Sequence, residues 1–71
     1  MKKYVYAMII RPATETVYMG LRDVTTEKLL TVYDYFLNDI NCDISEFAIV
    51  ICNDGHVKQE SFTAWYQKVT A

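Results

Sequence analysis

The sequence predicts a single small α+β domain over residues 1–71, with a helix packed on one face of an antiparallel sheet of three or four strands. Two short apolar runs, Tyr4–Ile10 and Phe47–Cys52, are rich in β-branched and aromatic residues, as strands are. Between them, residues 26–40 repeat apolar side chains at helical spacing. The chain is 52% apolar and 23% charged, too hydrophobic for a disordered segment. The predicted order is β-β-α-β followed by a short C-terminal helix or, alternatively, a fourth strand.

The first hairpin is expected within the first 22 residues. No polar residue interrupts Tyr4–Ile10, so we expect a central strand that is buried on both faces. Pro12 cannot donate to a sheet ladder and marks the turn. Residues 17–22 then alternate, which is typical of a half-buried strand. We expect Val17, Met19 and Leu21 on one face of it and Tyr18, Gly20 and Arg22 on the other.

The helix at 26–40 has clear end signals. Thr25 is a suitable N-cap, and Glu27 in the first turn complements the helix dipole. Asn41 is the expected C-terminal cap. The predicted buried stripe consists of Leu29, Tyr33, Phe36, Leu37 and Ile40.

After the helix, Phe47–Cys52 again predicts a strand buried on both faces. Asn53–His56 contains Asp-Gly, which tolerates the positive φ angles of tight hairpin turns. Residues 57–69 fit two structures. We favour a short strand or turn followed by a helix from about Ser61, while β-prone residues keep a fourth strand open. The helix would place Phe62, Trp65, Tyr66 and Val69 on one side.

Catalytic and metal motifs are weak in this sequence. Cys52, Asp54 and His56 alternate, but the turn between them interrupts the strand that would keep them on one side. Cys42 and Cys52 are expected to be free thiols. No phosphate-binding loop, serine elbow or HExxH motif occurs. We therefore predict no catalytic residues, no cofactor and no metal.

Charge is distributed unevenly. No Lys or Arg occurs between Lys28 and Lys58, whereas this stretch holds five carboxylates: Asp34, Asp39, Asp43, Glu46 and Asp54. The C-terminal half of the helix should therefore present an acidic surface. This surface is either an ordinary solvated face, or a docking surface for a basic partner, or a mimic of nucleic-acid phosphates. The basic residues Lys2, Lys3, Arg11 and Arg22 leave open a second surface around the first hairpin.

Aromatic residues are numerous, with six Tyr, three Phe and one Trp. Tyr is favoured where one end of a side chain is dry and the other wet, either at the edge of a core or in an interface. Tyr35 is predicted off the apolar stripe, Tyr18 on the polar side of its strand, and Trp65 on a terminal element that can dock on a partner or a second copy. The predicted partner-binding residues are Asp34, Tyr35, Asn38, Asp39, Tyr18 and Trp65.

These features favour a non-enzymatic protein-interaction module that binds a protein partner and forms a homodimer. A small regulator or inhibitor of the kind that phages and mobile elements encode is the nearest analogy. Nucleic-acid binding by the basic N-terminal hairpin and a small oligomeric enzyme using Cys52 or His56 are the alternatives. We expect neither a membrane segment, which needs about 18 consecutive apolar residues, nor a signal peptide, and hence a cytoplasmic protein.

Overall fold

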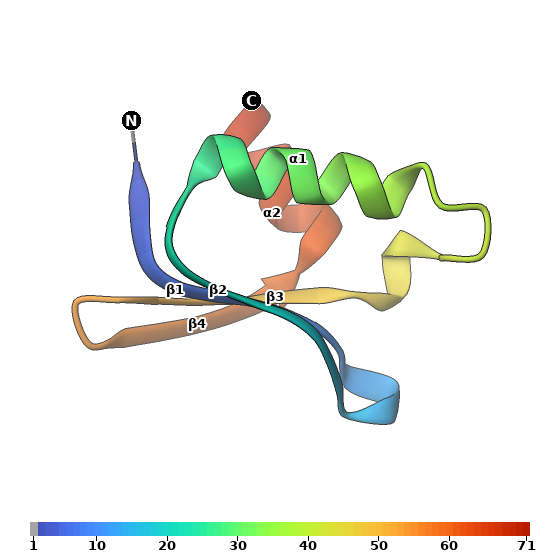
Figure 1. Cartoon of the computed structure of the whole chain (residues 1–71), viewed down its shortest axis with the longest axis horizontal. Coiled ribbons are helices and arrows are strands. Elements are labelled where there is room, and N and C mark those ends of the chain that lie inside the picture. Colours follow the sequence, from blue (N-terminus) through green and yellow to red (C-terminus); the bar gives the residue numbers. More distant parts are fainter. Residues whose placement is uncertain (1) are drawn as a thin grey trace.

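A computed structural model describes residues 2–71, in which two α-helices lie on the same side of a four-stranded antiparallel sheet (Figure 1). The strands are β1 (Lys3–Arg11), β2 (Thr16–Thr25), β3 (Ala48–Asn53) and β4 (His56–Ser61), in the spatial order β2-β1-β3-β4. The helices are α1 (Thr26–Leu37) and α2 (Phe62–Thr70), and short 3-10 turns occupy Pro12–Thr14 and Ile44–Glu46. The α+β prediction is confirmed, and the C-terminal segment contains both the fourth strand and the helix.

Helix α1 begins where the sequence predicts and ends earlier. The Thr25 hydroxyl accepts a hydrogen bond from the Lys28 amide at 3.1 Å, the expected N-cap. The helix stops at Leu37, because Asn38 caps it and its side-chain amide donates to the Asp34 carbonyl at 2.9 Å. The prediction of a helix to residue 40 with Asn41 as its cap is therefore wrong. Ile40, predicted in the buried stripe, is 96% exposed.

The core lies between the two helices and the sheet. Its aromatic centre joins α1 to α2, with Tyr33 stacked on Tyr66 at 4.0 Å and edge-on to Phe62 at 5.0 Å. Aromatic pairs in these geometries add about 0.5–1.5 kcal/mol each beyond area burial. The core residues are Tyr4, Ala7, Ile9, Val24, Leu29, Val32, Tyr33, Phe36, Phe47, Ile49, Phe62 and Trp65.

A bulge in β2 changes the predicted strand faces. Ile9 pairs with Met19 and Ile10 pairs with Val17, which leaves Tyr18 as an extra residue. Tyr18 therefore turns towards the helices, with its ring 5.1 Å from that of Phe47. The prediction that Val17 shares a face with Met19 is wrong, since the bulge moves Val17 to the opposite face of the sheet.

Strands β1 and β3 are central, as predicted, but only one face of each is covered. Ala7, Ile9 and Ile49 are buried beneath the helices. Met8 and Val50 pair with each other on the opposite face and are only half-buried. The prediction of burial on both faces is therefore wrong for the single chain, because both helices lie on the same side (Figure 1).

The hairpin joining β3 to β4 follows the sequence signal. Asp54 and Gly55 have φ angles of 50° and 81°, and Asn53 pairs with His56 across the turn. Two consecutive positive φ angles are what a tight hairpin requires, and Asp-Gly supplies them at low cost.

No helix within residues 2–71 is long and apolar enough to cross a membrane.

Candidate functional site

The C-terminal end of α1, the loop after it and the bulged part of β2 surround a surface hollow of about 420 Å³. Aromatic rings form much of its wall, and the carboxylates of Asp39, Asp43 and Glu46 stand around it. We call this site the acidic hollow. It is lined by Arg11, Tyr18, Met19, Tyr35, Phe36, Asp39, Asn41, Cys42, Asp43, Glu46 and Phe47.

Tyr35 is the most exposed aromatic side chain of the site. It is 67% exposed, and its ring meets that of Phe36 edge-on at 5.7 Å. Besides the acidic hollow, it lines a second, shallower depression with Asp34, Asn38 and Asp39. The structure thus brings these four predicted residues together on one side of α1. Tyr18, 48% exposed, joins them across the hollow from β2.

Trp65 does not belong to this surface. It is 1% exposed, and its ring packs 5.8 Å from that of Phe62 in the core. The Ser61 hydroxyl accepts a hydrogen bond from the Ala64 amide at 3.2 Å, which starts α2 in the phase that turns Trp65 inward. The prediction that Trp65 binds a partner directly is therefore wrong.

Arg11 closes one side of the acidic hollow. Its guanidinium lies 2.6 Å from a carboxylate oxygen of Glu46, and this ion pair raises the pKa of Arg11, aided by a side-chain hydrogen bond with Tyr18. The pair is partly exposed, so it contributes little to stability. It nevertheless neutralises one carboxylate of the site and links β1 to the Ile44–Glu46 turn.

The carboxylates of the aspartates in and beside the acidic hollow are not neutralised by neighbouring cations in the described residues. Asp43 accepts hydrogen bonds from the Ser45 hydroxyl at 2.6 Å and the Ser45 amide at 3.1 Å, which lower the pKa of its carboxyl group. Within residues 2–71, Asp34, Asp39 and Asp43 form no ion pair. The acidic hollow, with Asp39 and Asp43, and the neighbouring depression, with Asp34 and Asp39, therefore present uncompensated carboxylates beside the exposed Tyr35.

Cys42 lies in the hollow but is poorly suited to act as a nucleophile. Burial raises the pKa of its thiol, and the negative charges of Asp39, Asp43 and Glu46 raise that pKa further. A reactive cysteine needs the opposite environment, one that stabilises the thiolate. The thiol of Cys42 therefore stays protonated at neutral pH.

We expect Cys42 to react slowly with iodoacetamide. In a Cys52→Ser variant, where Cys42 is the single thiol, the folded protein should reach half its maximal rate at a pH above that of the same chain in urea. The rate is measured by mass spectrometry between pH 7 and 10. A folded-state midpoint at or below the unfolded one would contradict the raised pKa.

The other candidate clusters are dispersed by the sheet. Cys52 pairs with Val57, and the next residue, Asn53, pairs with His56. Because successive residues of a strand point to opposite faces of the sheet, the side chains of Cys52 and His56 lie on opposite faces. In the described part of the chain, no group of three or more His, Cys, Asp or Glu side chains is placed to hold a metal. Lys3 and Arg11 stand at opposite ends of β1.

Sequence patterns missed part of the site. Phe47 is predicted in a buried strand, but it precedes β3 and lines the acidic hollow, with its ring 5.1 Å from that of Tyr18. Leu37 and Ile40 are predicted in the buried stripe, but both side chains are exposed. The error at Ile40 comes from the early end of α1, which no periodicity reveals.

Comparisons with protein-family models, with curated proteins and with solved structures found no significant match. A functional proposal therefore rests on the chemistry of the acidic hollow and the depression beside it.

Proposed function

We propose that the protein is a non-enzymatic interaction module, a small regulator or inhibitor, that binds a basic protein segment at the acidic hollow. The observation that carries the proposal is Tyr35, a 67% exposed aromatic ring between a hollow and a depression that share the unpaired carboxylate of Asp39. Exposed tyrosines next to concave surface are typical anchors of protein interfaces.

Charge supports a basic partner. Asp34, Asp39 and Asp43 provide negative potential that complements Lys or Arg side chains and speeds their encounter. The exposed apolar side chains of Leu37 and Ile40 lie next in the chain to Asn38 and Asp39 and add hydrophobic area. A segment with basic residues and one or two apolar anchors fits this combination. Free Cys42 and Cys52 are consistent with a reducing, cytoplasmic location.

The test is an affinity capture with a matched charge control. The double variant Asp34→Lys with Asp39→Lys should recover a partner at least about tenfold less than the wild type, since two attractive charges become repulsive. The control carries Glu15→Lys with Glu27→Lys, the same change in net charge at positions outside the hollow. Tyr35→Ala should reproduce the loss without a change in charge.

Quantitative mass spectrometry of the captured proteins gives the readout. The specific partner should be basic, and its recovery should decline between about 50 and 300 mM salt because screening weakens the contact. Equal recovery by the wild type and by Asp34→Lys with Asp39→Lys would remove the acidic hollow as the binding site.

A further inference from the structure

The face of the sheet opposite the helices, which we call the open face, is apolar at its centre. The register places six apolar side chains on this side, Tyr6, Met8 and Ile10 of β1, Val50 and Cys52 of β3, and Val57 of β4, together with the polar Gln59 of β4, which pairs with Val50. The first five are half-buried and Val57 is 70% exposed. None of the six is charged. A solvent-facing antiparallel sheet normally carries polar residues at these alternate positions, so the open face has the composition of a covered surface.

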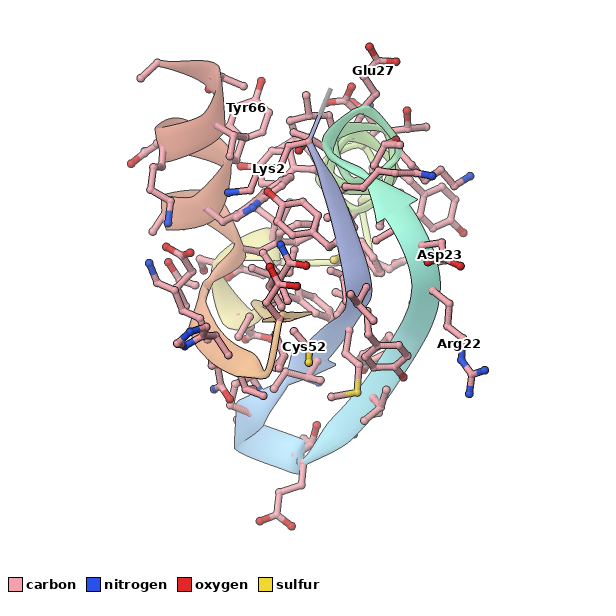
Figure 2. All side chains as sticks on the ribbon, turned by 90° about the vertical axis from the view of Figure 1, so that its left-hand side faces the viewer. Lys2, Arg22, Asp23, Glu27, Cys52 and Tyr66 are labelled. Carbon is pink, nitrogen blue, oxygen red and sulfur yellow. The ribbon has the colours of Figure 1, made fainter. Side chains whose placement is uncertain are left out.

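The edges of the open face carry two charged side chains, Arg22 of β2 and Glu15 of the adjacent turn. The Tyr6 ring lies across Gly20 of β2, where a Cβ atom would come within 2.5 Å of the tyrosine hydroxyl. Arg22, which pairs with Tyr6, is the charged residue of this strand face, and it points away from both helices (Figure 2). On β4, Lys58 and Glu60 pair with Ile51 and Ile49 and therefore belong to the helix side.

From these features we infer that the open face binds the open face of a second copy of this chain, forming a two-fold symmetric sheet-on-sheet dimer. A charged partner finds no group to pair with at the centre of this face, whereas two identical apolar centres bury no like charges against each other. Stacked sheets pack about 10 Å apart through interdigitating side chains, which the apolar rows of β1 and β3 provide.

The two ends of the open face differ in relief. One end holds a hollow lined by Met8, Ile10, Val17 and Val50, with Gln59 and the turn residues Pro12, Glu15 and Thr16 around it, and Val57 is exposed at the other end. A two-fold axis that lies between the sheets and runs across the strands exchanges these ends. Because each strand then lies opposite the same strand of the other copy, the Val57 side chain approaches the other copy's β4 near Gln59, which borders the hollow.

The available area sets the expected affinity. Four strands about 4.8 Å apart, with about 17 Å of length each, give a flat area of about 300 Å² per copy. The exposed side chains of Val17 and Val57, at 58% and 70% exposure, make the accessible area larger than this flat area. The two flat areas together make about 600 Å², so even with these exposed side chains the contact is at the small, weak end of specific interfaces, which bury roughly 1,000 Å² or more. We therefore expect a dissociation constant of about 10–100 μM.

Sedimentation equilibrium of the purified chain between about 1 and 500 μM tests the dimer. The wild-type mass should rise with concentration from 8.3 kDa towards twice that value. Val50→Lys, which buries a charge at the centre of the contact, should weaken association at least about 100-fold. Val57→Lys should weaken it about tenfold, and Ile40→Lys, an equally apolar position outside the open face, should leave it unchanged.

Two outcomes would overturn the inference. A mass that stays at 8.3 kDa up to 500 μM would leave the open face to another class of partner. Wild-type association by Val50→Lys would place any dimer at a sheet edge or at the helices. If thermal melting shows that Val50→Lys is unfolded, Val57→Lys decides, because Val57 is exposed and its replacement does not disturb the core.

Cys52 provides an independent readout, because it lies on the open face. In a Cys42→Ser variant it is the single thiol, and its rate of alkylation should drop several-fold as the concentration passes through the dissociation constant. A rate that does not depend on protein concentration would contradict burial of Cys52 in the dimer. The test uses the purified chain alone, so it is independent of the partner that we propose for the acidic hollow.

Discussion

Replacing Trp65 with alanine should destabilise the protein by about 3–5 kcal/mol, because it empties the volume of the largest fully buried side chain. A domain of 71 residues has a total stability of only about 4–10 kcal/mol. The variant should therefore be largely unfolded at 37 °C or melt many degrees below the wild type. The measurement is urea unfolding followed by far-UV circular dichroism, since the single tryptophan is lost as a fluorescent probe.

Tyr35→Ala is the matched aromatic control for Trp65→Ala. Tyr35 is 67% exposed, so its loss should cost less than about 1 kcal/mol of folding stability. The two substitutions should thus separate the core from the proposed binding surface. An unfolding midpoint of Trp65→Ala close to that of the wild type would contradict the position of Trp65 between α2 and the sheet.

The elements predicted correctly are those determined by neighbouring residues. The Thr25 cap and the Asp54-Gly55 turn each depend on one or two side chains and their own backbone. Strand pairing along the β1–β2 hairpin likewise follows from proximity in the chain. These local signals suffice for the fold class and for the order of most elements.

The wrong predictions depend on contacts between distant segments or on competing local bonds. Tyr18 becomes a bulge only because Ile10 pairs with Val17, a register that the hydrophobic pattern of β2 alone does not reveal. Helix α1 ends at Leu37 because the side chain of Asn38 satisfies a carbonyl, which interrupts an apolar pattern that continues to Ile40.

The acidic hollow was predictable in its charges and only partly in its shape. The carboxylates follow from a stretch without Lys or Arg, and Asp34, Tyr35 and Asn38 share a helix face by their spacing. The wall from β2 and the Arg11–Glu46 pair, 35 residues apart in the chain, depend on the tertiary fold. The prediction for Trp65 is wrong because the spacing gives its side of α2 but not whether that side packs on the sheet or on a partner.

Leu29→Ala and Leu37→Ala should differ strongly in stability, although the sequence places both leucines on one stripe of α1. Leu29 is fully buried, so its truncation should lower the free energy of unfolding by about 2–5 kcal/mol. Leu37 is the last residue of the helix and 52% exposed, so the same truncation should cost less than about 1 kcal/mol.

Urea unfolding of both leucine variants against the wild type measures this difference under identical conditions. The protein should be compared at a low concentration, about 1 μM, because dimerisation adds a concentration-dependent term to apparent stability. Equal losses for the two variants would mean that α1 continues beyond Leu37 and that its end packs on the sheet. In that case the hollow beside Tyr35 would be closed by Leu37 and Ile40, and the proposed binding surface would disappear with it.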